Sequence, residues 1–389
     1  MTLLTVVIPA YNEENGIAAI CERVLNVRSK LKQIGVDLEL LVVDDGSRDQ
    51  TAQIASGIEG LRVISHPKNR GYGAALKTGF AEAKGELIGF LDADGTYPPE
   101  YFPALCQQAL DGVDLVIGSR MAGEKSEMPL VRRLGNTFFA GLISLLGRRK
   151  ITDSASGMRV FKQEILEKVY PLPDGLNLTP IMSTRALHEN LKMVEIPIPY
   201  SERVGRSKLN AIRDGSVYLR SITWTVLTYN PVRIFGAIGL AGILLMILVG
   251  LGVIIARLSG VTDLGPWGVA ALFLGSVAGV VGVSVFSLGV AFNYLVTLFY
   301  KRPIRQGLFG KPIFKFPLEK HFGWLGVVLV LIGSLVGLIG IGLGISGWEI
   351  TRLWFYLLNS AMVIMVGTQL VIFWFLIQVL EELSNRFEC

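Results

Sequence analysis

The N-terminal half of the chain alternates short runs of Val, Ile and Leu with charged, glycine-punctuated stretches. Such runs, separated by helical patterning, are typical of a mostly parallel sheet with helices on both faces. The pattern therefore predicts a doubly wound α/β domain over residues 1–209, with its best helix candidates at residues 47–57 and 72–84. The predicted strands are Thr5–Pro9, Leu38–Val43, Leu61–Ser65, Glu86–Leu91 and Leu115–Ile117.

The C-terminal half changes character after Pro231 and contains four long apolar segments. A helix needs about 20 residues to cross the hydrocarbon core, and each segment reaches that length. We therefore predict four transmembrane helices within residues 232–381 and a short tail at 382–389. Residues 210–231 mix aromatic and basic side chains, which favours helices at the membrane interface. The four segments cover approximately residues 234–256, 268–298, 323–346 and 354–380.

The connection between the second and third apolar segments is strongly basic. From Lys301 to Lys320 it holds six Lys or Arg and one Glu. By the positive-inside rule this loop is cytoplasmic, which places the α/β domain and both termini of an integral, multi-pass protein there too. The net charge of +5 then suits anionic headgroups, and no nucleic-acid-binding motif accompanies it. Association into a homo-oligomer through the transmembrane helices stays open.

A shorter apolar stretch, Leu134 to Gly147, lies between clusters of basic residues. It is too short to span a bilayer, and its flanking cations suit a helix at headgroup level. The alternative is a buried helix packed under the sheet.

Two carboxylates, Asp92 and Asp94, follow the predicted strand that ends at Leu91. In an open α/β sheet, ligands bind at the carboxyl ends of the strands. Mg²⁺ and Mn²⁺ prefer oxygen ligands and are commonly held by one or two carboxylates together with substrate phosphates. The pair therefore predicts a magnesium or manganese site. Turn chemistry also selects Asp and Gly at a strand end, so that interpretation remains an alternative.

Acidic residues follow other predicted strands as well. Glu13 follows the first strand and Asp45 the second. Together with Asp92 and Asp94 they predict a nucleotide pocket in which Glu13 and Asp45 meet ribose hydroxyls or base N–H groups. Simple helix capping is the alternative. The segment Gly71-Tyr-Gly predicts a turn entering a helix, because it lacks the third Gly of the dinucleotide fingerprint and the spacing of a Walker loop.

Six motifs occur in a characteristic order along the α/β half. They are Val43-Asp-Asp-Gly-Ser47, Asn69-Arg-Gly-Tyr-Gly73, Asp92-Ala-Asp94 with Pro98-Pro-Glu100, Gly118-Ser-Arg120, Ser156-Gly-Met-Arg159 and Arg203-Val-Gly-Arg-Ser-Lys208. In this order they resemble the GT-A glycosyltransferases of family 2, and more narrowly the dolichol-phosphate mannose synthase and polyprenyl-phosphate glycosyltransferase branch. The resemblance covers about residues 4–210, and the apolar half is similar only in character to members with four helices.

The resemblance implies an activity. It implies inverting, metal-dependent transfer of a hexose from a nucleotide sugar of the GDP-mannose or UDP-glucose type to a dolichyl or undecaprenyl monophosphate at the cytoplasmic membrane face, giving a lipid-linked sugar for glycan assembly. It further implies a nucleoside pocket lined by Pro9, Tyr11, Glu13, Val43 and Asp45, contact of Asp92, Ala93 and Asp94 with the sugar nucleotide and metal, and phosphate-facing cations at Arg120, Arg203 and Lys208.

Two further candidates bear on the same site. Family members often carry Gln as a metal ligand two residues past the second Asp, where this chain has Thr96. A Thr hydroxyl can still coordinate Mg²⁺ or hold a bound water, so Thr96 is a candidate ligand. Asp153 is a candidate catalytic carboxylate that orients the acceptor-phosphate region or an Arg, and capping a turn is its alternative.

The acceptor's phosphate oxygen is already anionic at neutral pH, so the site needs charge neutralisation more than a strong base. Arg suits bidentate phosphate contact, whereas Lys acts as a point charge. The residues predicted to contact the acceptor phosphate are Arg206, Ser207 and Lys208.

Two other functions are compatible with this organisation. A processive polysaccharide synthase would share the nucleotide fold and the membrane helices, but its Gln-x-x-Arg-Trp motif is absent from the sequence. A non-enzymatic membrane scaffold or lipid-sugar translocator is the other alternative, and the retained Asp92, Asp94, Arg120 and Arg203 argue against it. The sequence leaves the donor sugar, the nucleobase and the lipid open.

Overall fold

The computed structural model describes residues 1–122, 128–147, 149–201, 211–261, 264–300, 319–348 and 350–387. The chain divides into two compact units, Met1–Thr225 and Val226–Cys389.

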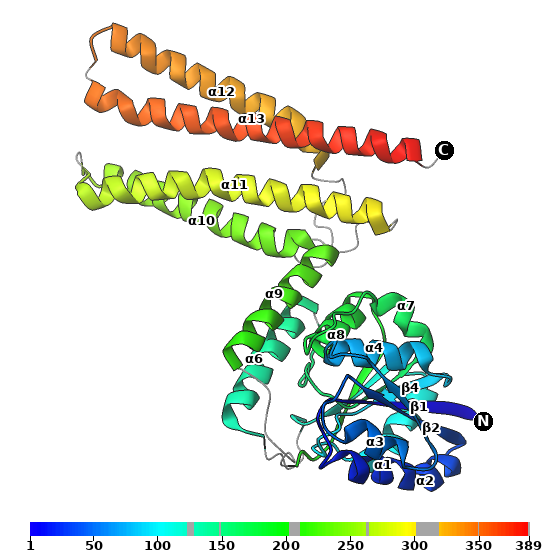
Figure 1. Ribbon diagram of the computed structural model, residues 1–389. Helices are drawn as coiled ribbons and strands as arrows, with labels where there is room; N and C mark the ends of the chain where they lie inside the picture. The colour runs from blue at the N-terminus through cyan, green and yellow to red at the C-terminus, as the bar shows by residue number, and fades with distance from the viewer. Residues whose placement is uncertain are drawn as a thin grey trace. The chain divides into compact units, whose positions relative to one another are not determined.

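The first unit alternates strands and helices along most of its length (Figure 1). Its elements are β1 (Thr2–Ala10), α1 (Ile17–Asn26), α2 (Arg28–Gln33), β2 (Val36–Asp44), α3 (Thr51–Ser56), β3 (Leu61–Ser65), α4 (Tyr72–Glu82), β4 (Leu87–Phe90), η1 (Pro99–Tyr101), α5 (Phe102–Leu110), β5 (Leu115–Ser119), α6 (Leu130–Gly147), β6 (Arg159–Lys162), η2 (Gln163–Ile165), α7 (Leu166–Val169), α8 (Leu178–His188), β7 (Met193–Pro197) and most of α9 (Ala211–Tyr229).

Within the described residues, seven strands form one sheet in the order β3-β2-β1-β4-β6-β5-β7. Strand β6 runs antiparallel to both of its neighbours, β4 and β5, while the other pairs are parallel. The predicted mostly parallel α/β sheet is confirmed, and each of the five predicted strands is present. Strands β6 and β7 were not predicted. Because β6 alone is reversed, its amino-terminal end lies at the edge where the other strands have their carboxyl ends.

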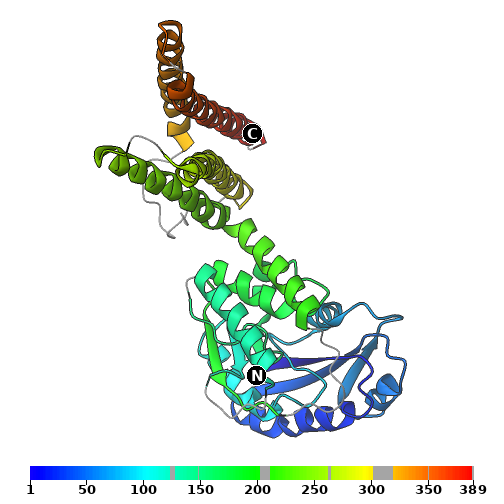
Figure 2. The ribbon, with the colours of Figure 1, turned by 90° about the vertical axis from the view of Figure 1, so that its left-hand side faces the viewer.

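Helices cover both faces of the sheet (Figures 1 and 2). Successive side chains of a strand point to opposite faces. Accordingly, Ile8 of β1 belongs to the cluster that includes residues of α1, α2 and α5, whereas Val7 packs against Gly79 of α4 on the other face. This double burial explains why the strands appear in the sequence as continuous apolar runs.

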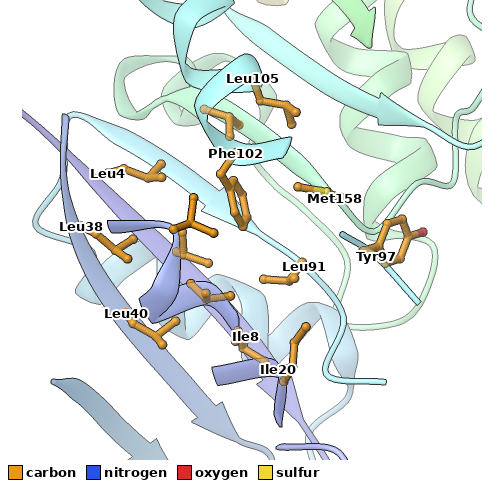
Figure 3. Packing of buried hydrophobic residues seen from close by; sticks show 14 of the residues in the cluster. Leu4, Ile8, Ile20, Leu38, Leu40, Leu91, Tyr97, Phe102, Leu105 and Met158 are labelled. Atoms are coloured by element: carbon orange, nitrogen blue, oxygen red, sulfur yellow. The ribbon is translucent and has the colours of Figure 1, made fainter. Parts of the chain in front are cut away.

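Phe102 of α5 anchors the first of these two layers (Figure 3). Its side chain is fully buried among Leu4, Leu91 and other members of the cluster. Gly89 of β4 makes room for the ring, since a Cβ there would lie 3.0 Å from a Phe102 ring carbon. Burial of such a side chain contributes about 1.5–3 kcal/mol, so this layer holds β4, and the segment that follows it, in place.

The second unit consists of long apolar helices in two pairs (Figure 2). They are α10 (Pro231–Leu258), α11 (Pro266–Tyr300), α12 (Glu319–Ile345) and α13 (Ile350–Phe387). Among the residues that the structure describes, these four helices are long and apolar enough to cross a membrane, as predicted. Glycines allow close approach within each pair: a Cβ on Gly239 or Gly326 would lie 2.6 Å from the carbonyl oxygen of Gly282 or Gly367, respectively.

Helix α6 covers the apolar stretch for which the sequence left two alternatives. Asn136, Ala140 and Ile143 are buried, whereas the side chains of Leu134 and Phe138 are 70% and 59% exposed. The helix therefore packs along one side and presents apolar side chains on another, so it is only partly buried, and its location at headgroup level stays a prediction.

Candidate active site

The two carboxylates of the Asp-Ala-Asp motif lie just beyond β4, at the carboxyl edge of the sheet. Asp92 Oδ1 accepts a 2.8 Å hydrogen bond from the hydroxyl of Tyr72, the first residue of α4. Gly157 packs against the same carboxylate, because a Cβ there would lie 2.5 Å from Asp92 Oδ2. Burial and the neighbouring Asp92 charge raise the pKa of Tyr72 well above its usual value, so its hydroxyl stays protonated and donates.

Asp94 is held by its own turn. Its Oδ1 accepts hydrogen bonds from the Thr96 hydroxyl at 2.6 Å and from the Thr96 backbone N–H at 3.2 Å. Gly95 between them has φ +75°, a conformation that favours glycine. The turn chemistry considered from sequence is therefore present, and it orients Asp94. Thr96, the candidate ligand, is 1% exposed with its hydroxyl directed to Asp94.

The donor set at this edge fits a hard divalent cation. Asp92 and Asp94 are both partly exposed, and a Mg²⁺ or Mn²⁺ ion commonly takes one or two carboxylates and completes its shell with water and phosphate oxygens. Among the described residues, no group of three or more His, Cys, Asp or Glu side chains could hold a metal ion. With two carboxylates from the chain, a cation here would complete its shell with water and phosphate oxygens.

Arg120 and Asp153 form a buried ion pair. The guanidinium donates from Nε to Asp153 Oδ2 at 2.7 Å and from Nη2 to Oδ1 at 2.8 Å, and the Arg120 backbone N–H adds a 3.0 Å bond. Burial by itself raises the pKa of Asp153, but the charge and hydrogen bonds of Arg120 outweigh it and hold that pKa below its usual value. Of the alternatives left by the sequence, the structure has Asp153 orienting an Arg.

Two tyrosines flank this arginine. Its guanidinium carbon lies 5.6 Å from the ring centroid of Tyr97 and 5.3 Å from that of Tyr200. Distances of this size are typical of cation–π contacts. Arg120 is thus fixed by one carboxylate and two rings.

The turn from Ser154 to Gly157 connects Asp92 with the arginine side of the site. Gly157 donates its backbone N–H to Tyr97 Oη at 2.7 Å, so it touches both Asp92 and a ring beside Arg120. Arg159, fully buried at the start of β6, donates to the carbonyl oxygens of Ser154 and Ser156 at 2.8 and 3.1 Å. Burial lowers the pKa of Arg159 to about 10, which leaves it charged at neutral pH and able to hold the turn.

The predicted nucleoside residues gather around the ends of β1 and β2. Pro9 and Val43 are register partners in these strands, and Tyr11 and Glu13 follow β1. The two following loops are joined, since Asn12 N–H donates to Ser47 Oγ at 2.9 Å.

Asp45 is largely engaged by its own chain. Its carboxylate is 2% exposed and accepts hydrogen bonds from His66 Nδ1 at 2.7 Å and from the backbone N–H groups of Arg70 and Gly71 at 2.9 and 2.8 Å. A carboxylate only accepts, so Nδ1 of His66 carries a proton. Asp45 therefore anchors the Asn69-Arg-Gly-Tyr-Gly loop, which enters α4 at Tyr72 as predicted.

The structure brings together Asp92, Ala93 and Asp94, and it joins them through Gly157 and Tyr97 to Arg120 and Asp153. The predicted residues Arg203, Arg206, Ser207 and Lys208 lie outside the described residues. Sequence reasoning assigned no role to five residues that the site contains. All of them except Tyr200 stand in or beside a quoted motif, which was the available signal: Tyr72, Tyr97, Gly157, Arg159 and Tyr200.

Comparison with known proteins gives two matches to family profiles. Residues 5–170 match the profile described as Glycosyl transferase family 2, and residues 231–388 match a domain of unknown function.

Individual relatives are similar over the first part of the chain. A dolichyl-phosphate hexose transferase of Haloferax volcanii is 32% identical over 219 residues, covering 56% of this chain and 92% of that protein. A dolichol-phosphate mannosyltransferase of Pyrococcus furiosus is 33% identical, covering 62% and 69%. An undecaprenyl-phosphate 4-deoxy-4-formamido-L-arabinose transferase of Proteus mirabilis is 31% identical, covering 63% and 75%.

Among solved structures, glucosyl-3-phosphoglycerate synthase from Mycobacterium tuberculosis is 23% identical, with a TM-score of 0.47, and the match covers 59% of this chain and 78% of that one.

Proposed function

This chain belongs to glycosyl transferase family 2, and we propose that it transfers a hexose from a nucleotide sugar to a polyprenyl monophosphate at the cytoplasmic face of a membrane. The names of its relatives support the acceptor class, because they include transferases for dolichyl phosphate, dolichol phosphate and undecaprenyl phosphate. The donor is of the GDP-mannose or UDP-glucose type.

One observation carries the proposal: a continuous set of contacts joins the carboxylate pair to a fixed arginine. Asp92 touches Gly157, Gly157 bonds Tyr97, and the Tyr97 ring lies against Arg120. Transfer between two phosphate-bearing substrates requires a place for each and relief of their mutual repulsion. The carboxylate end suits the donor, and the arginine end suits the acceptor phosphate.

In this proposal some residues orient the reacting groups and others neutralise their charge. Asp153 takes two of the five N–H donors of the Arg120 guanidinium, which fixes its plane and leaves further donors for a phosphate. Asp153 also neutralises the charge of Arg120. Arg120 therefore stabilises a bound phosphate mainly through directed hydrogen bonds. Asp92 and Asp94 would hold a divalent cation, which would supply positive charge against the leaving nucleoside diphosphate. The anionic acceptor oxygen attacks without a strong general base.

The exposed apolar side of α6 supports contact with a lipid surface. Leu134, Phe138 and Leu145 are 59–73% exposed on a helix that also carries Arg132 and Arg133. Apolar side chains beside cations suit the headgroup region. The basic loop at residues 301–320 supports a cytoplasmic location for the catalytic unit by the positive-inside rule.

The test is a product assay with the full chain in detergent. Labelled GDP-mannose, UDP-glucose and UDP-N-acetylglucosamine are each incubated with dolichyl or undecaprenyl phosphate and Mg²⁺ or Mn²⁺. We expect one donor to give a lipid-soluble product whose mass adds a single sugar, and we expect a chelator to abolish it.

Asp94→Asn should lower the rate by at least about 100-fold, the order expected when one electrostatic stabiliser is removed. Asp111→Asn, at an exposed aspartate that contacts Gln107, is the matched control and should leave the rate unchanged. A long polymeric product would indicate a processive synthase, and no product from any pairing would contradict the proposal.

A further inference from the structure

Each carboxylate of the Asp-Ala-Asp motif accepts a short hydrogen bond from a different hydroxyl. The Thr96 hydroxyl donates to Asp94, two residues away in the same turn. The Tyr72 hydroxyl donates to Asp92, 20 residues away, and so joins the start of α4 to the end of β4. The first bond forms wherever the turn forms, whereas the second exists only if the amino-terminal end of α4 is brought to the end of β4.

The start of α4 is held firmly in that place. Gly71, which precedes Tyr72, has φ +106°, and a Cβ on it would lie 2.6 Å from the carbonyl oxygen of Asp174. Ala74 N–H donates to that same carbonyl at 3.1 Å, and Gly71 N–H donates to Asp45 at 2.8 Å. The backbone around Tyr72 is therefore fixed from two sides, so its hydroxyl arrives at Asp92 from a set direction.

Gly157 approaches the same Asp92 carboxylate closely. A single added methyl group there would reach 2.5 Å from Oδ2 and 2.7 Å from Oδ1. The carboxylate thus has two neighbours, a hydroxyl donor and the backbone at Gly157, and both restrict its rotation. A metal ligand that is already oriented loses less conformational freedom on binding, and partners that orient ligands influence metal affinity strongly.

We propose that Tyr72 is a positioning residue that, with Gly157, sets the orientation of the Asp92 carboxylate for a divalent cation and the donor diphosphate. The inference rests on the proposed function, because that function supplies the cation. It assigns a role to the tyrosine of the Asn69-Arg-Gly-Tyr-Gly73 motif, and it makes the start of α4 part of the metal site without direct coordination.

The experiment measures Mn²⁺ binding to the detergent-solubilised full chain by electron paramagnetic resonance of free Mn²⁺, with GDP or UDP present. Tyr72→Phe removes only the hydroxyl, and we expect the Mn²⁺ Kd to rise about 10- to 100-fold, the usual range for loss of a ligand-orienting partner. The KM for polyprenyl phosphate should not change. Tyr170→Phe removes a hydroxyl from a tyrosine that is 36% exposed and should leave the Mn²⁺ Kd as it is.

Gly157→Ala is a second variant, because its added methyl group would crowd the same carboxylate, and it should also raise the Mn²⁺ Kd. Thermal unfolding without metal separates this role from a structural one, which would lower the Tm and leave the Mn²⁺ Kd unchanged. A Kd within twofold of the unaltered chain in either variant overturns the inference, as does absence of Mn²⁺ binding by the unaltered chain. Failure of the proposed function would be distinct: Mn²⁺ would bind, but no lipid-linked sugar would form.

Discussion

The Asp153 carboxylate accepts two hydrogen bonds, of 2.7 and 2.8 Å, from the Arg120 guanidinium, and Asp153 is fully buried. Such an interaction needs both partners, because a buried charge that loses its counter-ion remains desolvated. The pair therefore ties the orientation of the arginine to the stability of the fold around it.

Replacement of Arg120 by Ala should be strongly destabilising. Breaking a buried pair on one side costs about 3–5 kcal/mol, so the Tm of the first unit should fall clearly in differential scanning fluorimetry. Arg23→Ala is the control, because it breaks a bidentate contact with Glu100 at the surface, where the two side chains are 41% and 46% exposed. An exposed ion pair of this kind contributes about 0–1 kcal/mol to stability. Equal losses of Tm in the two variants would contradict the distinction.

The stabilisation that Asp153 provides should disappear in acid. Its pKa is held below the ordinary value in the folded protein, so its contribution is complete above the unfolded pKa of about 3.9 and is lost as the pH falls through the folded pKa. Asp153→Asn should therefore lower the Tm most near neutral pH, and the difference from the unaltered chain should narrow below about pH 4. Melting curves from pH 3 to 7 test this, and a difference that widens in acid would refute it.

The Thr96 hydroxyl should matter through Asp94. Thr96→Val keeps the shape of the buried side chain but removes the 2.6 Å donor, so we expect weaker Mn²⁺ binding in the presence of nucleoside diphosphate, by about 10-fold. Thr96→Ser keeps a hydroxyl and should restore most of the affinity. Mn²⁺ titrations of the two variants give the comparison, and equal affinities would show that the hydroxyl has no such role.

Replacement by alanine should change the stability of the fold in opposite directions at two glycines. Gly46 has φ +71°, and a Cβ there would lie 2.6 Å from the Lys68 carbonyl carbon, so Gly46→Ala should destabilise by at least about 1–3 kcal/mol. Gly135 lies in α6 with nothing within 4 Å of an added Cβ, so Gly135→Ala should stabilise by about 0.4–1 kcal/mol. Thermal unfolding of both variants checks the sign as well as the size.

Local pattern was sufficient for much of the fold. The run from Leu40 to Val43 is apolar because this part of β2 is buried on both faces, and such runs are visible in the sequence without knowledge of their neighbours. Strand β6 was missed because it has only four residues and contains Arg159 and Lys162, which weakens an apolar signal. Its reversal is a property of pairing, which local pattern does not carry.

In the candidate site, too, the sequence predicted the contacts between neighbouring residues but not those between distant ones. Asp92 and Asp94 could be placed at a strand end because strand and turn adjoin in the chain, and the turn through Thr96 closes over two residues. The engagement of Asp45 by His66 and by the loop before α4 could not be predicted, since its partners lie 21 to 26 residues away. The sequence likewise could not show whether Asp153 orients an Arg or caps a turn, because its partner Arg120 lies 33 residues away.

The sequence by itself determined the α/β unit, the four apolar helices, the family resemblance and the carboxylate pair at the end of β4, because each depends on residues close together in the chain. Only the tertiary structure decided that Tyr72 and Gly157 contact Asp92, and that Asp153 orients Arg120. For Gly157 and Asp153 the physical reason is the reversed strand β6. It returns the Ser154–Gly157 turn to the carboxyl edge of the sheet, where side chains distant in sequence meet within hydrogen-bonding distance.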